Sequence, residues 1–193
     1  MLYPAIAKII NQKNQAIIIT RYTEQIEEMD KDVITKQKQQ YEKYNKEIIE
    51  DKISSVDLLQ KGQVLGYIKI EKLNVFLPIY QGTDDKTLLK GIGHLEKTTM
   101  PTKDYAYHAV FVGHTGITSK KFFDDLLNLK VGDEFEVTIL NESFKYKIYD
   151  IKTVLPSQTK DLKVQSNKQL VTLVTCTPKF VNSHRLLVTG QKE

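Results

Sequence analysis

The sequence predicts a mainly β fold, a barrel or a sandwich, that follows an N-terminal helical region. From Gly62 onward, short apolar runs alternate with polar turns, which is typical of a chain of short strands. Helical segments between these runs are few, so the regular alternation of strand and helix found in parallel α/β sheets is missing. Up to residue 62, by contrast, the chain holds one glycine and one proline and is rich in Gln, Lys, Glu and Ile.

The first 62 residues are predicted to form amphipathic helices. One apolar stripe has the four-three-four spacing of a helix face and consists of Tyr22, Ile26, Met29 and Val33. The polar segment 35–40 interrupts this stripe, and a second stripe begins in a shifted phase at Tyr41. We therefore expect one long helix or two consecutive helices packed on another part of the protein. A coiled coil agrees less well with the break in phase.

Two apolar runs, 64–70 and 75–82, are predicted to be strands. Pro78 lies inside the second run, and a proline in a strand favours a sheet edge or a bulge because it lacks an N–H. Residues 84–96 are predicted to contain one short helix that ends at a glycine.

The remainder of the chain follows the same plan. Residues 107–116 predict a buried strand that stops at Gly113, and 119–133 predict a helix that Gly132 closes. Alternating apolar residues in 135–139 and 144–148 predict a hairpin. Two further strands are expected at 169–176 and 184–190.

Composition excludes several classes of protein. The net charge is only +4, from 28 basic and 24 acidic residues scattered evenly, so no nucleic-acid partner is expected. A single cysteine rules out an internal disulfide, and the four histidines lack metal-binding spacing, so we expect no metal and no cofactor. No apolar run approaches the roughly 18 residues of a transmembrane helix, and the first residues lack the plan of a signal peptide.

The only cysteine, Cys176, stands at the end of an apolar run, directly before Thr-Pro. A lone cysteine in such a strand is more often a small core residue than a nucleophile. The end of a strand, however, presents a side chain at a rim. Arg185 opens the next strand after the loop 177–183, close to the sulfur if the two strands are neighbours. A cation favours the nucleophilic thiolate, and a guanidinium can also hold an oxyanion.

Acyl transfer also needs a proton donor, and histidine serves at neutral pH. The candidates are His94, His108, His114 and His184. His108 and His114 are six residues apart on one predicted strand, roughly 20 Å, so at most one lies near Cys176. His114 follows the end of the strand, where side chains lie at the rim, so we select it as the proton donor. His108 and His94 are expected to be structural. His184 precedes Arg185, and neighbours on a regular strand face opposite sides.

With these residues in place, the chain resembles a known family. The segment "TCTPKFVNSHRLLVTG" and the segment "HAVFVGHTG" are similar to the cysteine and histidine signatures of the sortases, cysteine transpeptidases of Gram-positive cell surfaces. The order of His114, Cys176 and Arg185 matches as well. The segments "GYIKIEKLNVFLPIYQGT" and "LLKGIGHLEKTTMP" resemble class C, the pilin-polymerising branch.

The resemblance implies a closed eight-stranded barrel at 63–193 and a helical region at 1–62. It implies a monomer at the outer face of the cell membrane, anchored by a segment absent from this sequence. Its substrates would be pilin subunits, which carry an LPxTG-like sorting signal and an acceptor lysine. Cys176 would form a thioester, His114 would transfer protons and Arg185 would stabilise the oxyanion. Thr175 would lie beside the bound peptide.

The chain also departs from the family pattern. Class C members commonly carry an Asp-Pro-aromatic lid, but the connection 50–63 has no proline, so we expect an open cleft. Lys179 and Phe180 stand where family members often have an aromatic-Gly pair, and Thr115 stands where they often have an arginine. These residues flank the site, so the sequence does not specify which sorting signal the enzyme accepts. Two alternatives remain: a cysteine hydrolase using the same three residues, and a non-catalytic surface scaffold with Cys176 as core filler.

Overall fold

The structure, a computed structural model, describes residues 3–52, 58–103, 105–116, 122–158 and 162–193. Its helices are α1 (Tyr3–Glu28), α2 (Lys31–Ile49) and α3 (Asp85–Leu88), with 3₁₀ turns η1 (Glu71–Leu73) and η2 (Leu126–Asn128). Its strands are β1 (Val64–Ile70), β2 (Val75–Gln81), β3 (Ile92–His94), β4 (Tyr107–Val112), β5 (Glu134–Ile139), β6 (Glu142–Val154), β7 (Gln169–Thr177) and β8 (His184–Lys192).

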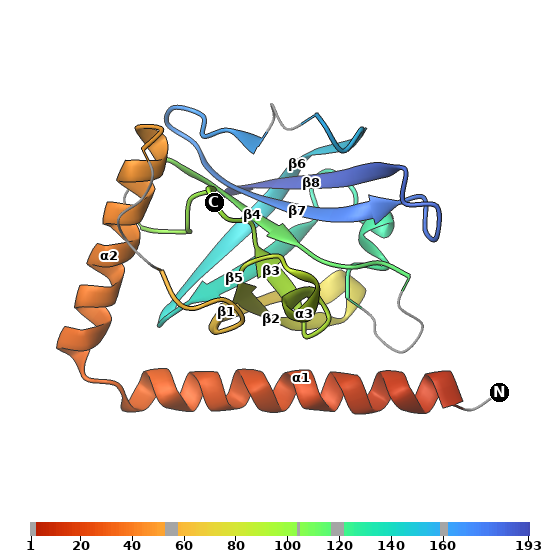
Figure 1. Ribbon diagram of the computed structural model, residues 1–193, viewed down its shortest axis with the longest axis horizontal. Coiled ribbons are helices and arrows are strands. Elements are labelled where there is room, and N and C mark those ends of the chain that lie inside the picture. Colours follow the sequence, from red (N-terminus) through yellow and green to blue (C-terminus); the bar gives the residue numbers. More distant parts are fainter. Residues whose placement is uncertain (1–2, 53–57, 104, 117–121, 159–161) are drawn as a thin grey trace.

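The strands form a closed barrel in the order β1-β2-β3-β4-β7-β8-β6-β5 (Figure 1). Pairing of β1 with β5 closes the barrel, with Gly66 opposite Ile139. All neighbours are antiparallel except β2 with β3 and β4 with β7. The eight-stranded barrel expected from the sequence is therefore confirmed.

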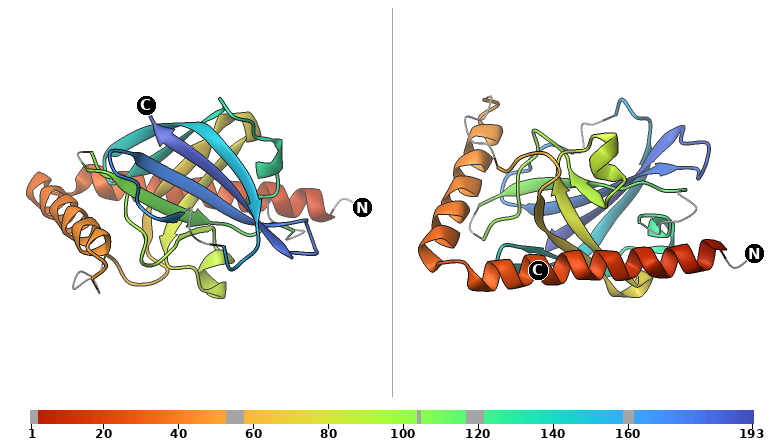
Figure 2. Two further views of the ribbon diagram at one scale, coloured as in Figure 1. Left: turned by 90° about the horizontal axis from the view of Figure 1, so that it is seen from above. Right: turned by 60° about the horizontal axis from the view of Figure 1, so that its bottom comes forward.

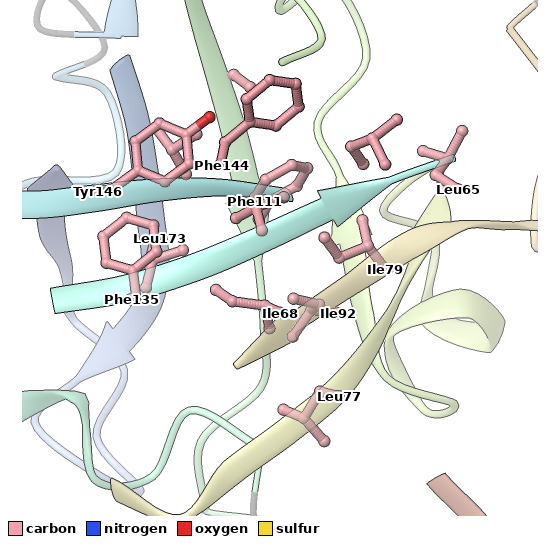
Figure 3. Close-up of a cluster of buried hydrophobic side chains, with 14 of the residues drawn as sticks. Leu65, Ile68, Leu77, Ile79, Ile92, Phe111, Phe135, Phe144, Tyr146 and Leu173 are labelled. Atoms are coloured by element: carbon pink, nitrogen blue, oxygen red, sulfur yellow. The ribbon is translucent and has the colours of Figure 1, made fainter. Parts of the chain in front are cut away.

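The interior of the barrel is a continuous apolar core. Figure 3 shows Ile68, Phe111 and Leu173 gathered between strands that are far apart in the sequence. All three side chains are fully buried. Alternating residues of each strand supply this core, as the pleat of a half-buried strand requires.

The two N-terminal helices lie against different sides of the barrel (Figures 1 and 2). Helix α1 runs along one side of the barrel. Helix α2 is steeply inclined to α1 and lies beside another side of the barrel. The break falls at Asp30, whose carboxylate accepts the Asp32 N–H at 2.7 Å and caps α2. The expected interruption at 35–40 was therefore misplaced. Since the new helix resets the phase, Val33 is 48% exposed and Ile34 is buried instead.

Both helices are fixed to the barrel by hydrogen bonds from buried side chains. The Tyr22 hydroxyl of α1 donates to Leu65 O at 2.7 Å and accepts from Leu140 N at 2.8 Å. Asn45 of α2 accepts from Met100 N at 2.7 Å and donates to Met100 O at 2.8 Å. Helix residues share the main buried cluster with strand residues. The domain boundary at residue 62 stays a prediction.

The predicted strands and the hairpin are present, but two predicted helices are much shorter than expected. In 84–96 only α3 is helical, and Ile92–His94 forms β3, which pairs in parallel with β2. Gly93 permits this pairing, because an added Cβ would lie 2.1 Å from Gly82 O. In 119–133 the described residues hold only η2, while 117–121 lie outside them.

Pro78 lies in β2 at a position that is paired on one side only. It pairs with Tyr67 of β1, whereas pairing with β3 starts only at Ile79. The missing N–H therefore costs no ladder bond on that side, although β2 lies between β1 and β3 in the closed barrel and is not the edge strand that the proline favoured. Within the described part of the chain, neither long helix is apolar enough to cross a membrane.

Candidate active site

The register of three neighbouring strands brings the three predicted residues into one row. In the parallel pair β4–β7, Val112 lies opposite Val174, and the next residue, Gly113, donates its N–H to Val174 O at 3.0 Å. Two residues after Val112 lies His114, and two residues after Val174 lies Cys176. In the antiparallel pair β7–β8, Cys176 lies directly opposite Arg185. Three residues separated by up to 71 positions thus meet at one end of the strands.

These side chains lie on the outer face of the barrel. Residues two apart on a strand share a face, and the face of Cys176 and Arg185 therefore continues to Val174 and Leu187. Both of these belong to a small buried cluster separate from the barrel core. We call this cluster the outer apolar strip; its members are Val110, Val174 and Leu187, packed against Leu95, Val112, Val154 and Leu162.

The row is accessible. Cys176, His114 and Arg185 are each half-buried. Among the described residues, neither the thiol nor the His114 imidazole has a hydrogen-bond partner. Catalytic hydrogen bonds are often long in free enzymes and tighten only when a substrate is bound.

Arg185 is held by the loop that precedes it. Its Nη1 donates to the carbonyl oxygens of Asn182 and His184, both at 3.0 Å. A guanidinium carries five donors in a fixed fork. Anchoring one nitrogen therefore restricts the direction of the remaining donors, and the register places Arg185 directly opposite Cys176.

Thr175 has a different geometry from its neighbour Cys176. It is 3% exposed, and its hydroxyl donates to Gly113 O at 2.7 Å. This bond ties β7 to the residue that precedes His114. The structure therefore gives Thr175 a place in holding the row together, and its contact with a bound peptide stays a prediction.

The remaining histidines are engaged elsewhere. His94 lies in β3 rather than beside a helix end, is fully buried, and contacts Gln81, Thr98 and Thr99 through its ring nitrogens. Burial lowers its pKa from 6.5 to about 4. His108 Nε2 meets Thr172 Oγ1 at 2.6 Å, and its Nδ1 meets the Lys163 carbonyl at 2.9 Å. The structural roles expected for both are confirmed.

The expected open cleft concerns the connection 50–63, of which 53–57 lie outside the described residues. The described end of this connection packs away from the site. Leu58 is buried in the main core cluster with Leu59 beside it, and neither belongs to the outer apolar strip. The absence of a lid stays a prediction.

Sequence reasoning missed Asp124. It is the first residue of an Asp-Asp pair in the segment after β4, and its carboxylate forms an ion pair with Lys179 in the loop after Cys176. No spacing rule distinguishes Asp124 from Asp125. Lys179 differs from the family pattern, but nothing in the sequence pairs it with Asp124, so this pairing is visible only in the tertiary structure.

A half-buried thiol aligned with an imidazole and a guanidinium on the outside of a closed barrel defines a candidate cysteine acyl-transfer site. The family model described as "Sortase domain" matches residues 68–193, well over half of the chain. The chain belongs to the sortase family.

Solved structures refine this placement to class C. Clostridium perfringens sortase C, in a structure with the C-terminal cell wall sorting motif, is 37% identical, with a TM-score of 0.85 over 91% of this chain and 97% of that one. Streptococcus agalactiae sortase C1, in complex with MTSET, is 32% identical, with a TM-score of 0.83 over 89% of this chain and 96% of that one.

Among curated relatives, sortase D of Bacillus subtilis is 31% identical over 119 residues, which cover 62% of this chain and 57% of the relative. Sortase A of Bacillus anthracis is 29% identical over 133 residues, 68% of this chain and 61% of the relative. The chain thus spans about three fifths of the length of these two relatives.

Proposed function

We propose that this chain is a class C sortase that joins pilin subunits covalently at the outer face of a Gram-positive cell membrane. The observation that carries the proposal is the row of His114, Cys176 and Arg185 across β4, β7 and β8. The resemblance to sortase C of C. perfringens, solved with a cell wall sorting motif, supports a sorting signal as substrate. The enzyme works as a monomer, anchored by a segment outside this sequence.

The half-buried members of the outer apolar strip offer a surface for the sorting signal: Leu95 after β3, Val112 of β4, Val154 of β6 and Leu162 in the β6–β7 connection. They pack against Val110, Val174 and Leu187, which are buried on the face that Cys176 shares. An extended LPxTG-like peptide presents alternate side chains to one surface. Its apolar Leu-Pro end would lie on this strip, and its Thr–Gly bond would reach Cys176.

In the first step, the Cys176 thiolate attacks the carbonyl carbon of the Thr–Gly bond. Arg185 donates hydrogen bonds to the oxyanion that develops in the tetrahedral intermediate. The C–N bond then breaks, and His114 in its protonated form gives a proton to the departing glycine amine. The product is a thioester between Cys176 and the threonine carbonyl.

In the second step, a lysine amine of another pilin attacks the thioester carbonyl. His114, now neutral, takes a proton from the attacking amine, and the C–S bond breaks to return the thiolate. The net reaction exchanges one amide bond for another and regenerates both groups. No redox change occurs, and the chain's own residues account for every proton.

The test combines a sorting-signal peptide, an amine acceptor and product analysis by mass spectrometry. The proposal expects an amide adduct from the wild-type protein and none from Cys176→Ala. His114→Ala should lose at least about 100-fold in rate, because general acid–base catalysis contributes 10²–10⁴-fold. The matched control is His184→Ala, since His184 lies outside the row with its Nδ1 bonded to Ser183 Oγ at 2.9 Å; it should keep most activity.

Other outcomes identify the alternatives. Cleaved peptide without an adduct would indicate a cysteine hydrolase. No cleavage, together with a Cys176 that resists alkylation at neutral pH, would indicate a non-catalytic scaffold.

A further inference from the structure

The segment that carries His114 is closed by its own hydrogen bonds. His114 O accepts the Phe123 N–H at 3.2 Å, and Asp124 Oδ1 accepts the Gly116 N–H at 3.0 Å. His114 itself and Gly116, two residues further on, are therefore bound to two consecutive residues, Phe123 and Asp124. Whatever fixes Asp124 also fixes the backbone around His114.

Asp124 is fixed from the other side by Lys179. Lys179 Nζ lies 2.6 Å from Asp124 Oδ1, and the two side chains are 45% and 9% exposed, respectively. The carboxylate is thus almost buried, and its second oxygen, Oδ2, has no hydrogen-bond partner among the described residues. A nearly buried carboxylate depends strongly on its cation, unlike the partners in an exposed surface pair.

Lys179 belongs to the loop that follows Cys176, and this loop is in direct contact with the His114 segment. A Cβ on Gly116, whose φ is +86°, would lie 3.4 Å from the Phe180 ring. Lys179 Nζ also lies 5.6 Å from the centre of that ring. The two loops therefore share one contact, which is formed by Asp124 and Gly116 on one side and Lys179 and Phe180 on the other.

The conformation of the second loop is strained. Phe180 adopts φ 70°, in the left-handed region that a bulky side chain rarely enters. Its side chain is 76% exposed, so burial of the ring does not compensate for the strain. Strained residues persist where surrounding contacts determine their conformation, and they gather at functional sites. Phe180 lies in a turn in which Pro178 O accepts the Val181 and Asn182 N–H groups at 3.1 and 2.9 Å, and its ring adds the contacts with Gly116 and Lys179.

We propose that the Asp124–Lys179 ion pair is a latch that positions the His114 imidazole relative to the Cys176 sulfur. The inference rests on the proposed function and names two positioning residues for it. The latch joins the segment after β4 to the loop after β7, and each of these segments adjoins one reacting group. Breaking it leaves peptide binding at the outer apolar strip intact and lowers the population of the reactive arrangement.

The test compares the steady-state kinetics of Lys179→Met, Asp124→Asn, their double variant and Lys179→Arg. Loss of alignment should lower kcat by about 5- to 50-fold with KM within twofold, since small misplacements of reacting groups cost up to about 100-fold. The double variant should lose no more than the worse single variant, because both break one interaction. Lys179→Arg should keep most of the wild-type kcat.

The matched control is Lys72→Met. Lys72 pairs with Asp133 at 2.7 Å with exposures of 44% and 21%, away from the row; this variant should keep wild-type kinetics. Hydrogen exchange gives a readout that is independent of activity: Lys179→Met should speed exchange of the Gly116 and Phe123 amides, with no change in global stability.

The possible failures are distinguishable. An inactive wild type with faster exchange in Lys179→Met would overturn the proposed function and keep the latch as a structural contact. An active wild type with Lys179→Met equal to Lys72→Met in kcat, or altered only in KM, would overturn the latch. Exchange that is unchanged at Gly116 would also overturn it.

Discussion

At the scale of single residues, burial decides which histidines can do chemistry. His94 is fully buried among Gln81, Thr98 and Thr99, and its charged form is disfavoured because the site removes water. His114 lies half-buried at the end of β4 with no hydrogen-bond partner among the residues described. The same side chain thus serves as a neutral core group in one place and as a candidate acid and base in the other.

His94 gives a pH dependence with a definite sign. Its pKa is lowered from 6.5 to about 4, so the unfolded state binds the extra proton between these values. The contribution of His94 to the free energy of unfolding is fully present above about pH 6.5. It is lost as the pH falls toward 4, and the loss amounts to about 3 kcal/mol. Urea unfolding of the wild type and His94→Gln at several pH values measures this, and the variant should show a shallower acid loss.

The matched control is His184→Gln, because His184 is half-buried at the start of β8. This variant should keep the full acid loss of the wild type. Equal acid limbs for the wild type and His94→Gln would contradict the assignment.

At the scale of elements, hydrogen bonds from single side chains determine where the helices dock. In helix α1, the Tyr22 hydroxyl bonds Leu65 in β1 and Leu140 in the turn between β5 and β6. Helix α2 begins at its own cap and docks through Asn45, which is 1% exposed. The apolar stripes predicted only that these helices pack on another part of the protein. The polar contacts determine where on the barrel each helix docks.

Asn45→Ala tests the docking of α2. The substitution leaves Met100 N–H and C=O buried without the partners that now lie at 2.7 and 2.8 Å. Each orphaned backbone group costs about 1–3 kcal/mol, so we expect a loss of about 2–4 kcal/mol in the free energy of unfolding. Chemical denaturation measures it. Gln40→Ala, at an exposed position of the same helix, should stay within about 0.5 kcal/mol, and similar losses for both would refute the docking role.

At the scale of the whole molecule, closure of the barrel depends on a close backbone approach. Strand β1 meets β5 with Gly66 opposite Ile139, and the register of β1 with β2 shifts between Val64 and Gly66. A Cβ at Gly66 would lie 1.9 Å from Thr138 O, a distance no real contact allows. Only glycine therefore permits the closing pair of strands.

Gly66→Ala should therefore destabilise the protein by more than about 3 kcal/mol, beyond the usual cost of overpacking. Thermal and urea unfolding followed by circular dichroism measure the loss. Gly132→Ala is the comparison: its φ is +95° but nothing lies within 4 Å of an added Cβ, so it should cost only the backbone strain of about 1–2 kcal/mol. A Gly66→Ala variant as stable as Gly132→Ala would contradict this account of closure.

Local pattern was sufficient for most strands and insufficient for some helices. The hairpin of β5 and β6 and the strands β1, β2, β4, β7 and β8 lie where alternation and apolar runs placed them. The short helix predicted within 84–96 ends at Leu88, and the residues after it form β3, in which Gly93 fits against the Gly82 backbone beside β2. Helical periodicity carries no information about such a pairing.

The sequence by itself determined the strands other than β3, the motif segments and the strand-end positions of His114, Cys176 and Arg185, because each depends on residues adjacent in the chain. The tertiary structure decided the pairing of β4 with β7 and of β7 with β8, and hence the row. It also decided the pairing of Asp124 with Lys179, 55 residues apart. Register and loop-to-loop contacts come from packing between distant segments, which no local pattern specifies.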